Sequence, residues 1–174
     1  LSGKNVLQWL GMAHGMANAI DYDRWLDRVG LTEAADRKVR GYSVGMKQRL
    51  GIAAALMTDP ELIILDEPTS GMDPTGIQDI RALIRSLADD DGVTVIMASH
   101  QLLEVQRICD RVAIIDHSRI AEVGKVSDVF SSPKSDIARE LILPMANTAT
   151  ASYGRRLRIV FDGTSSQKPL VSNM

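Results

Sequence analysis

The chain has 174 residues, of which 45% are hydrophobic, and carries a formal net charge of −2. This size suits one domain with a small appendage, and the hydrophobic content is enough for a sizeable core. The slightly negative charge, without a long basic run, argues against a nucleic-acid partner. Cys109 is the single cysteine, so an internal disulfide is excluded, and a buried structural thiol is expected there. No stretch approaches the roughly 18 apolar residues of a membrane span.

The first sixty residues are predicted to be helical. Apolar residues recur at helical spacing around Val6–Ala19 and Tyr22–Val29, and Thr32 is a candidate N-cap in the connection that follows. A stronger helix is predicted after Ser43, its N-cap, and it stops at Asp59-Pro60. Its apolar positions are Met46, Leu50, Ala53, Ala54 and Met57.

A buried strand is predicted next, at Leu62–Leu65, and it ends in two adjacent carboxylates, Asp66 and Glu67. Ligands of open α/β sheets bind at the carboxyl ends of the strands. Paired acids there suit phosphoryl transfer, in which one helps to hold Mg²⁺ and the other orients or deprotonates the attacking water. The alternative is a strand that ends in a solvated acidic turn, and this segment alone leaves both interpretations open.

Alternating helices and strands follow. Asp73 and Pro74 predict the start of a helix, as its N-cap and first residue, with an apolar face made by Ile77, Ile80, Ile84 and Leu87. Residues 93–98 predict another buried strand, which ends at Ser99-His100. The order of these elements indicates an α/β fold, with a mostly parallel sheet covered on both faces and a helical subdomain before it.

The last third is predicted to contain a helix to about Cys109, a hairpin of residues 112–115 and 119–123, and a terminal helix at about 135–143. Residues 144–154 are small and polar, which is typical of a linker. The alternation of Leu157, Ile159 and Phe161 with other residues then predicts the first strand of a further domain. We therefore expect domains at 1–143 and 155–174, in a piece of a longer protein that begins here with Leu1.

Four segments together resemble the second half of an ABC-transporter nucleotide-binding domain, a kind of P-loop NTPase. Residues 42–49 (YSVGMKQR) are similar to the signature, residues 62–68 (LIILDEP) to Walker B, and residues 70–73 (SGMD) to the D-loop. His100 resembles the switch histidine of the family. The order and spacing of four such segments are very specific.

The signature resemblance implies that Ser43, Val44, Gly45 and Met46 grip the γ-phosphate of ATP held by the opposite subunit. A helix N-terminus, with its free N–H groups and dipole, favours such an anion. Ser43 as a simple N-cap is compatible with this role. Val44 and Met46 depart from the usual signature, which has glycine and glutamine at these places.

The other three segments imply the catalytic parts. By resemblance, Asp66 supports Mg²⁺ through water, Glu67 is the general base, and Asp73 couples the two sites of a dimer. His100 would hold the γ-phosphate and the attacking water in line. The cofactors implied are ATP and Mg²⁺. The partners implied are a second nucleotide-binding subunit, head to tail, and transmembrane permease subunits, at the cytoplasmic face of the membrane.

The resemblance differs along the chain. Residues 1–100 are similar to exporter-type subunits, whereas residues 107–174 are similar to the methionine-importer ATPase, including the start of its ligand-sensing domain. Import of methionine-like amino acids and export through a multi-pass permease both remain open. Two other classes are a non-catalytic docking module and a DNA-bound ATPase of the SMC type. The short spacing leaves no room for the coiled-coil arm of the latter.

The phosphate-binding loop of the family, Gly-x-x-x-x-Gly-Lys-Ser/Thr, does not occur in the 174 residues. Without its nest of N–H groups and its lysine, most contacts to the phosphates are missing. We therefore expect the chain by itself to be inactive as an ATPase.

Overall fold

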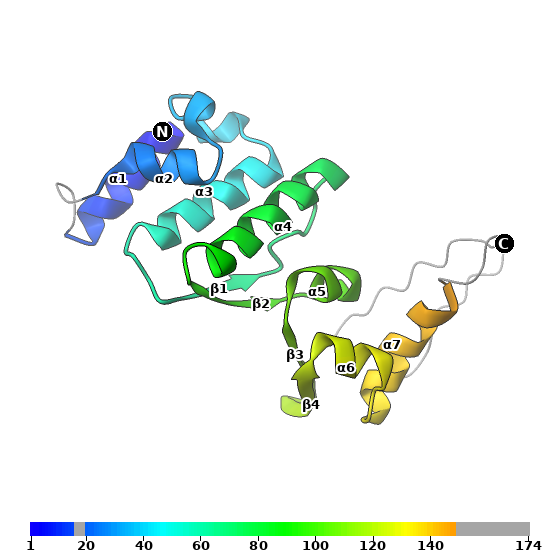
Figure 1. Cartoon of the computed structure of the whole chain (residues 1–174). Coiled ribbons are helices and arrows are strands. Elements are labelled where there is room, and N and C mark those ends of the chain that lie inside the picture. The colour runs from blue at the N-terminus through cyan, green and yellow to red at the C-terminus, as the bar shows by residue number, and fades with distance from the viewer. Residues whose placement is uncertain (16–19, 149–174) are drawn as a thin grey trace, which may run out of the picture. The chain divides into compact units, whose positions relative to one another are not determined.

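The computed structural model describes residues 1–15 and 20–148, which fall into two compact units divided between Ser99 and His100 (Figure 1). The first unit contains α1 (Gly3–Ala13), α2 (Tyr22–Arg28), the short 3-10 turns η1 (Thr32–Ala34) and η2 (Val39–Gly41), α3 (Val44–Leu56), β1 (Leu62–Asp66), α4 (Pro74–Asp89) and β2 (Thr94–Ala98). The second contains α5 (Leu102–Ile108), β3 (Arg111–Asp116), β4 (Arg119–Lys125), α6 (Val126–Ser131) and α7 (Asp136–Thr148).

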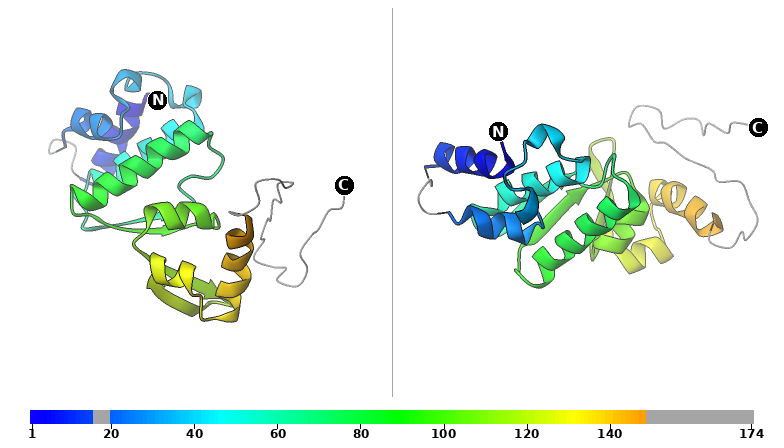
Figure 2. Two further views of the ribbon diagram at one scale, coloured as in Figure 1. Left: turned by 45° about the vertical axis from the view of Figure 1, so that its right-hand side comes forward. Right: turned by 90° about the horizontal axis from the view of Figure 1, so that it is seen from above.

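Helices form most of the first unit. α1, α2 and α3 pack against one another, α3 also packs against α4, and α4 packs against β2 (Figure 2). Their fully buried side chains are Leu7, Leu26, Ile52, Leu56, Ile80 and Leu87. The longer helices begin as predicted, because Ser43 caps α3, and Asp73 caps α4 with Pro74 as its first residue.

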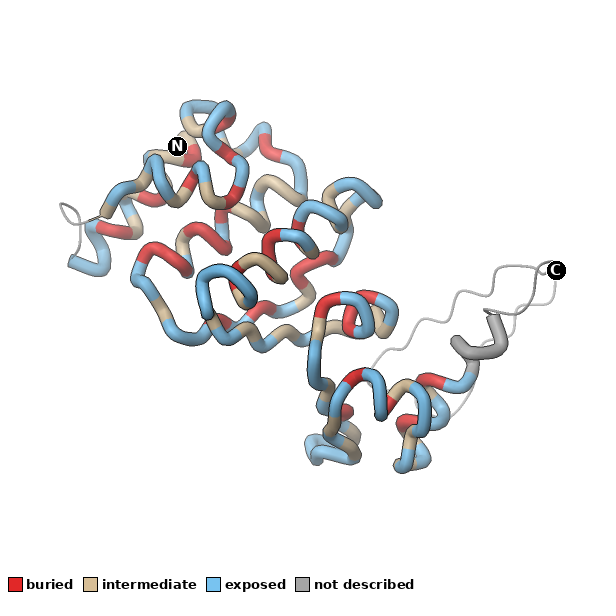
Figure 3. Tube along the Cα trace, viewed as in Figure 1, coloured by how far each residue is buried: buried red, intermediate tan, exposed pale blue. Residues whose placement is uncertain are grey.

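The sheet of the first unit has two parallel strands, β1 and β2, with Ile64 opposite Ile96. Only one face of β1 is buried, through Ile63 and Leu65. On the other face Ile64 is 71% exposed, Ile96 52% and Leu62 46% (Figure 3). The predicted parallel pairing is therefore confirmed, but the prediction that both strands are buried on both faces is wrong within the described residues.

The second unit is built on the predicted hairpin. β3 and β4 pair antiparallel, and the two turn residues His117 and Ser118 have φ of 45° and 60°. Two central residues with positive φ match the twist of the flanking strands. α6 and α7 pack against β4, and the core cluster consists of Ile114, Val129, Ala138 and Ile142.

Three details differ from the predictions. Leu31, not Thr32, is at the N-cap position of η1, and the Thr32 hydroxyl donates to Asp27 Oδ1 at 3.1 Å. Cys109, expected to be buried, is half-buried at the end of α5. α7 runs to Thr148, so the first residues of the predicted linker are helical. The predicted strand and domain at 155–174 lie outside the described residues.

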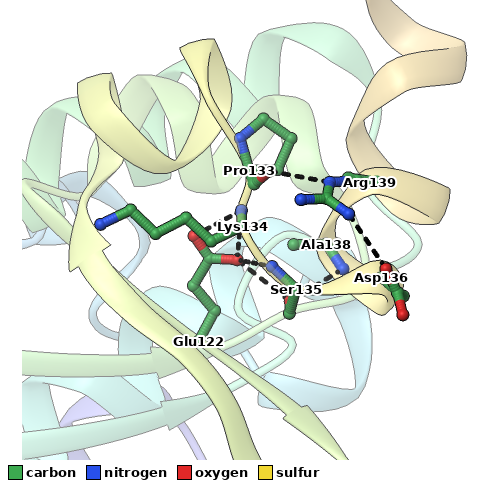
Figure 4. A network of polar contacts seen from close by, with 7 residues as sticks. All are labelled: Glu122, Pro133, Lys134, Ser135, Asp136, Ala138 and Arg139. Atoms are coloured by element: carbon green, nitrogen blue, oxygen red, sulfur yellow. Dashed lines mark hydrogen bonds and ion pairs between the residues drawn. The ribbon is translucent and has the colours of Figure 1, made fainter.

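One carboxylate joins the hairpin to the start of α7 (Figure 4). Glu122 of β4 accepts hydrogen bonds from the backbone N–H groups of Lys134 and Ser135, the latter at 2.8 Å, and from the Ser135 hydroxyl at 3.0 Å. Ser135 Oγ in turn accepts from Ala138 N–H, as an N-cap does. The bond from Ser135 N–H, with the other donors, lowers the pKa of the Glu122 carboxyl below its ordinary value.

A pH dependence follows from this contact. Because the pKa of Glu122 is lower in the folded chain, its contribution to stability is full above the ordinary value of 4.5 and is lost as the pH falls through the folded pKa. Glu122→Gln is expected to reduce the stability of the second unit at neutral pH and to flatten its decline in acid. The protection of the Ser135 amide against exchange, followed from about pH 6 down to about pH 3, measures both effects. Glu140→Gln, an exposed acid on α7, is the control. An unchanged acid profile in Glu122→Gln would contradict the assignment.

Candidate functional site

The carboxyl end of β1 presents two acids. Asp66, the last strand residue, is exposed and lies opposite Ala98 of β2. Glu67 follows and is half-buried, and its N–H donates to the Ala98 carbonyl at 2.9 Å. Its φ is 47°, in the left-handed region, which costs a non-glycine residue about 1 kcal/mol. The burial pattern of the strand continues through this bend, so Asp66 faces solvent and Glu67 is partly buried.

The N-terminus of α3 is the second part of the site. Ser43 Oγ accepts from Met46 N–H at 3.2 Å, and the first helical hydrogen bond runs from Lys47 N–H to the Ser43 carbonyl. The N–H groups of Val44 and Gly45 precede this bond and point along the axis out of the helix. Such an end favours a negative charge.

The N-terminus of α4 is the third part. Asp73 Oδ1 accepts from Gly76 N–H at 3.1 Å, so this carboxylate is the N-cap of the helix. A Cβ added to Gly76 would lie 2.8 Å from Asp73 Oδ1, closer than side-chain carbons come. Glycine at this place therefore lets the cap form.

The structure brings the two helix N-termini together. A Cβ added to Gly45 would lie 3.7 Å from Met72 Sδ and 3.9 Å from Gly76 Cα. A Cβ added to Gly71 would lie 4.0 Å from Val44 Cγ1. The turn that opens α3 and the loop that leads into α4 therefore lie close together, and an added methyl group would be in ordinary contact with both, although some 25 residues separate them in the chain.

Comparison with known proteins identifies a family. Residues 4–70 match the family described as ABC transporter. A methionine import ATP-binding protein (MetN) of Caulobacter vibrioides is 39% identical over 152 residues, which are 86% of this chain and 46% of that protein. The chain carries part of an ABC-transporter ATP-binding domain. The uncharacterized ABC transporter ATP-binding protein YdbJ of Bacillus subtilis is 53% identical over 103 residues, 59% of this chain and 33% of that protein.

The fold leads to the same family. An ATP-binding cassette of an ABC transporter, solved in its ADP conformation, matches with a TM-score of 0.60 and 28% identity, over 67% of this chain and 47% of that one. The chain spans about half the length of the curated relatives and solved cassettes that it matches, or less. The predicted recognition and the α/β P-loop NTPase class are confirmed.

Residues 43–46, the predicted signature turn, lie close to residues 70–73, the predicted D-loop, of the same chain. Two glycines at this place differ in the space around them, which gives a matched pair of variants. Gly45→Ala meets only ordinary contacts, so the free energy of unfolding should stay the same or rise by up to about 1 kcal/mol through better helix propensity. Gly76→Ala displaces the Asp73 carboxylate and loses the cap, so it should be about 1 kcal/mol less stable than Gly45→Ala. Urea unfolding measures both, and equal stabilities would contradict the assigned role of Gly76.

His100 begins the second unit and is exposed, two residues beyond Ala98. The structure describes the two units separately, so it does not test the predicted role of His100 beside Glu67. That role stays a prediction.

The acid pair fits the Mg²⁺ that accompanies a nucleotide. Among the described residues, no group of three or more His, Cys, Asp and Glu side chains could hold a metal ion. Mg²⁺ bound with ATP needs little more than one or two carboxylates, because phosphates and waters supply its other ligands. Exposed Asp66 meets this requirement.

Two residues that hold α3 in place were missed in the sequence. The buried Tyr42 donates to the Ala34 carbonyl at 2.6 Å, burial raises the pKa of its phenol, and a Cβ on Gly3 would collide with its hydroxyl. Arg49 Nη1 donates to the Val29 and Gly30 carbonyls at 3.3 and 3.4 Å, just beyond α2. A cation at a helix C-terminus is favourable. The sequence signals were the arginine that ends the YSVGMKQR segment and the glycine that begins α1.

Proposed function

We propose that this chain is part of the subunit of an ABC transporter that binds and hydrolyses ATP and powers solute transport through a membrane permease. The observation that carries the proposal is the acid pair at the carboxyl end of β1, where Glu67 has a left-handed backbone directly after exposed Asp66. Strained backbone of this kind gathers at functional sites. The closeness of the signature turn (residues 43–46) to the D-loop (residues 70–73) supports it further.

Each acid has a separate task in this proposal. Asp66 holds Mg²⁺ through water, and the ion, when bound, neutralises charge on the phosphates. Glu67 accepts the proton of the attacking water, and His100 orients that water and the γ-phosphate. Asp73 couples the two sites of the dimer, in addition to capping α4.

The proposed partners are a second nucleotide-binding subunit and permease subunits, and the N-terminal end of α3 supports the first of them. The residues Ser43–Met46 bind the γ-phosphate of a nucleotide that the second nucleotide-binding subunit holds, in a head-to-tail dimer. The dimer docks on permease subunits at the cytoplasmic face of the membrane. In the part of the chain that the structure describes, none of the helices is both long and apolar enough to cross a bilayer.

The proposed substrate is methionine or a related amino acid. The support is the name of the Caulobacter relative, a methionine import protein, at 39% identity. Uptake of labelled methionine by cells that lack their own importer and carry the complete transporter tests this. Uptake that stays at background, with the ATPase active, would exclude methionine and leave an export substrate as the alternative.

The ATPase proposal is tested with two forms of the protein: the 174-residue chain, and the complete subunit that contains it. Without the glycine-rich phosphate loop, the chain alone should bind ATP roughly a thousandfold more weakly than the complete subunit, a loss of several kcal/mol, and should not release phosphate. Calorimetric titration with Mg-ATP and a phosphate-release assay measure the two properties. Mg²⁺-dependent turnover by the chain alone, lost in Glu67→Gln, would contradict the predicted inactivity. A complete subunit that neither binds nor hydrolyses ATP would contradict the function itself.

A further inference from the structure

Met72 occupies the space between two helix N-termini. Its Sδ is 3.7 Å from the place that a Cβ on Gly45 of α3 would take, and 3.7 Å from that place on Gly76 of α4. Its Cβ is 3.6 Å from the latter. Both neighbours are glycines, and the half-buried methionine side chain is within ordinary contact distance of a methyl group placed on either one.

Met72 lies between places where charge matters. Gly45 is in the first turn of α3, beside the Ser43 cap, and Gly76 donates the N–H that binds the Asp73 carboxylate. Both helix ends carry a partial positive charge. Their close approach is therefore electrostatically unfavourable, and the Asp73 carboxylate offsets it, while the methionine fills the space beside them. A thioether is flexible and polarisable, so it fills such an irregular gap without requiring a hydrogen bond.

Met72 also belongs to the loop that begins at Glu67. Ser70 N–H donates to the Glu67 carbonyl at 3.1 Å, and Gly71 has a φ of 71°, so the loop is a defined turn rather than an extended segment. Met72 directly precedes Asp73. One short loop thus carries Glu67 at its start and, at its end, the side chain that lies beside the signature turn.

We propose that Met72 is a positioning residue that holds the signature turn against the D-loop, so that the turn that binds the partner's γ-phosphate and the loop that carries Glu67 keep one relative position. This inference rests on the proposed function. It adds a link within one subunit. The turn that binds the nucleotide of the partner subunit is held to the loop that acts on the nucleotide of the same subunit.

The test uses the complete subunit, assembled as a dimer and supplied with Mg-ATP. Met72→Ala opens the gap between the two glycines without touching a nucleotide. It should lower kcat by about tenfold, as a small misplacement of reacting groups does, with the KM for ATP unchanged. The dependence of the rate on ATP concentration should also become less cooperative, because the two segments serve different nucleotides. Met72→Leu, which conserves volume, should restore both.

The controls separate this role from general destabilisation. Met12→Ala removes a methionine that is 58% exposed on α1 and should change neither parameter. A fall in kcat that Met72→Leu does not restore, or one accompanied by loss of folded protein in thermal unfolding, would overturn the positioning role. A normal kcat in Met72→Ala while Glu67→Gln is inactive would overturn the inference and leave the proposed function intact. An active Glu67→Gln would instead count against the base that the proposed function assigns.

Discussion

Replacement of Glu67 by glutamine is expected to lower ATP turnover by the complete subunit by about a thousandfold, within the range for loss of a general base. Glutamine has nearly the same size and can adopt the same backbone, but it cannot accept the proton of the attacking water. The left-handed φ of 47° and the N–H bond to Ala98 should persist in the variant. Steady-state phosphate release measures the rate, and equilibrium titration should show that the affinity for ATP is kept.

Glu61 supplies the matched control, because it precedes β1 as Glu67 follows it. Glu61→Gln makes the same chemical change at the other end of the strand and removes one negative charge from an exposed site. Its turnover should stay within about twofold of the original protein. If Glu67→Gln turns over ATP as fast as Glu61→Gln, Glu67 is not the base. Equal losses in both variants would mean that charge or folding, not proton transfer, is responsible.

The largest effect on stability is expected from Ile80→Ala in α4. Ile80 is fully buried, and truncation leaves a cavity in the contact of α4 with its neighbours, at a cost of about 3 kcal/mol. For a unit of this size the midpoint of thermal unfolding should fall by roughly 15 °C. Urea unfolding of the 174-residue chain, followed by a probe in the first unit, measures the loss.

Ile64→Ala is the comparison for this variant. Ile64 has the same side chain, but it is 71% exposed on the outer face of β1. Its truncation in the 174-residue chain should cost within about 0.5 kcal/mol. A cost similar to that of Ile80→Ala would mean that the outer face of the sheet is covered in solution.

Local signals in the sequence were sufficient for most of the fold. Ser43 and Asp73 are caps because short polar side chains bond the first N–H groups of a helix, and such a bond needs only neighbouring residues. The parallel pairing of β1 with β2 also follows from the order of the elements. The short α6 was not predicted as a helix: it has only six residues and no side-chain cap, and it starts directly after β4.

Burial and distant contacts were harder to predict. Leu62–Leu65 is aliphatic throughout, which predicts burial of both faces, but exposure depends on what packs against each face. For the site, the sequence indicated the acid pair and the two turns by resemblance. Gly45 and Met72 lie close together although they belong to different elements, and no repeating pattern in the sequence predicts that these two elements meet. The bond from Tyr42 to the Ala34 carbonyl was missed for the same reason.

The outer face of the β1–β2 sheet affects the solubility of the chain. Ile64 and Ile96 lie exposed and directly opposite each other, and in the described residues each strand pairs on one edge only. The stretch Leu62–Leu65 is uncharged and rich in β-branched and aliphatic side chains, the composition that favours intermolecular strand addition and aggregation. A lysine at position 64, in the middle of this stretch, would act as a gatekeeper during expression and concentration of the chain.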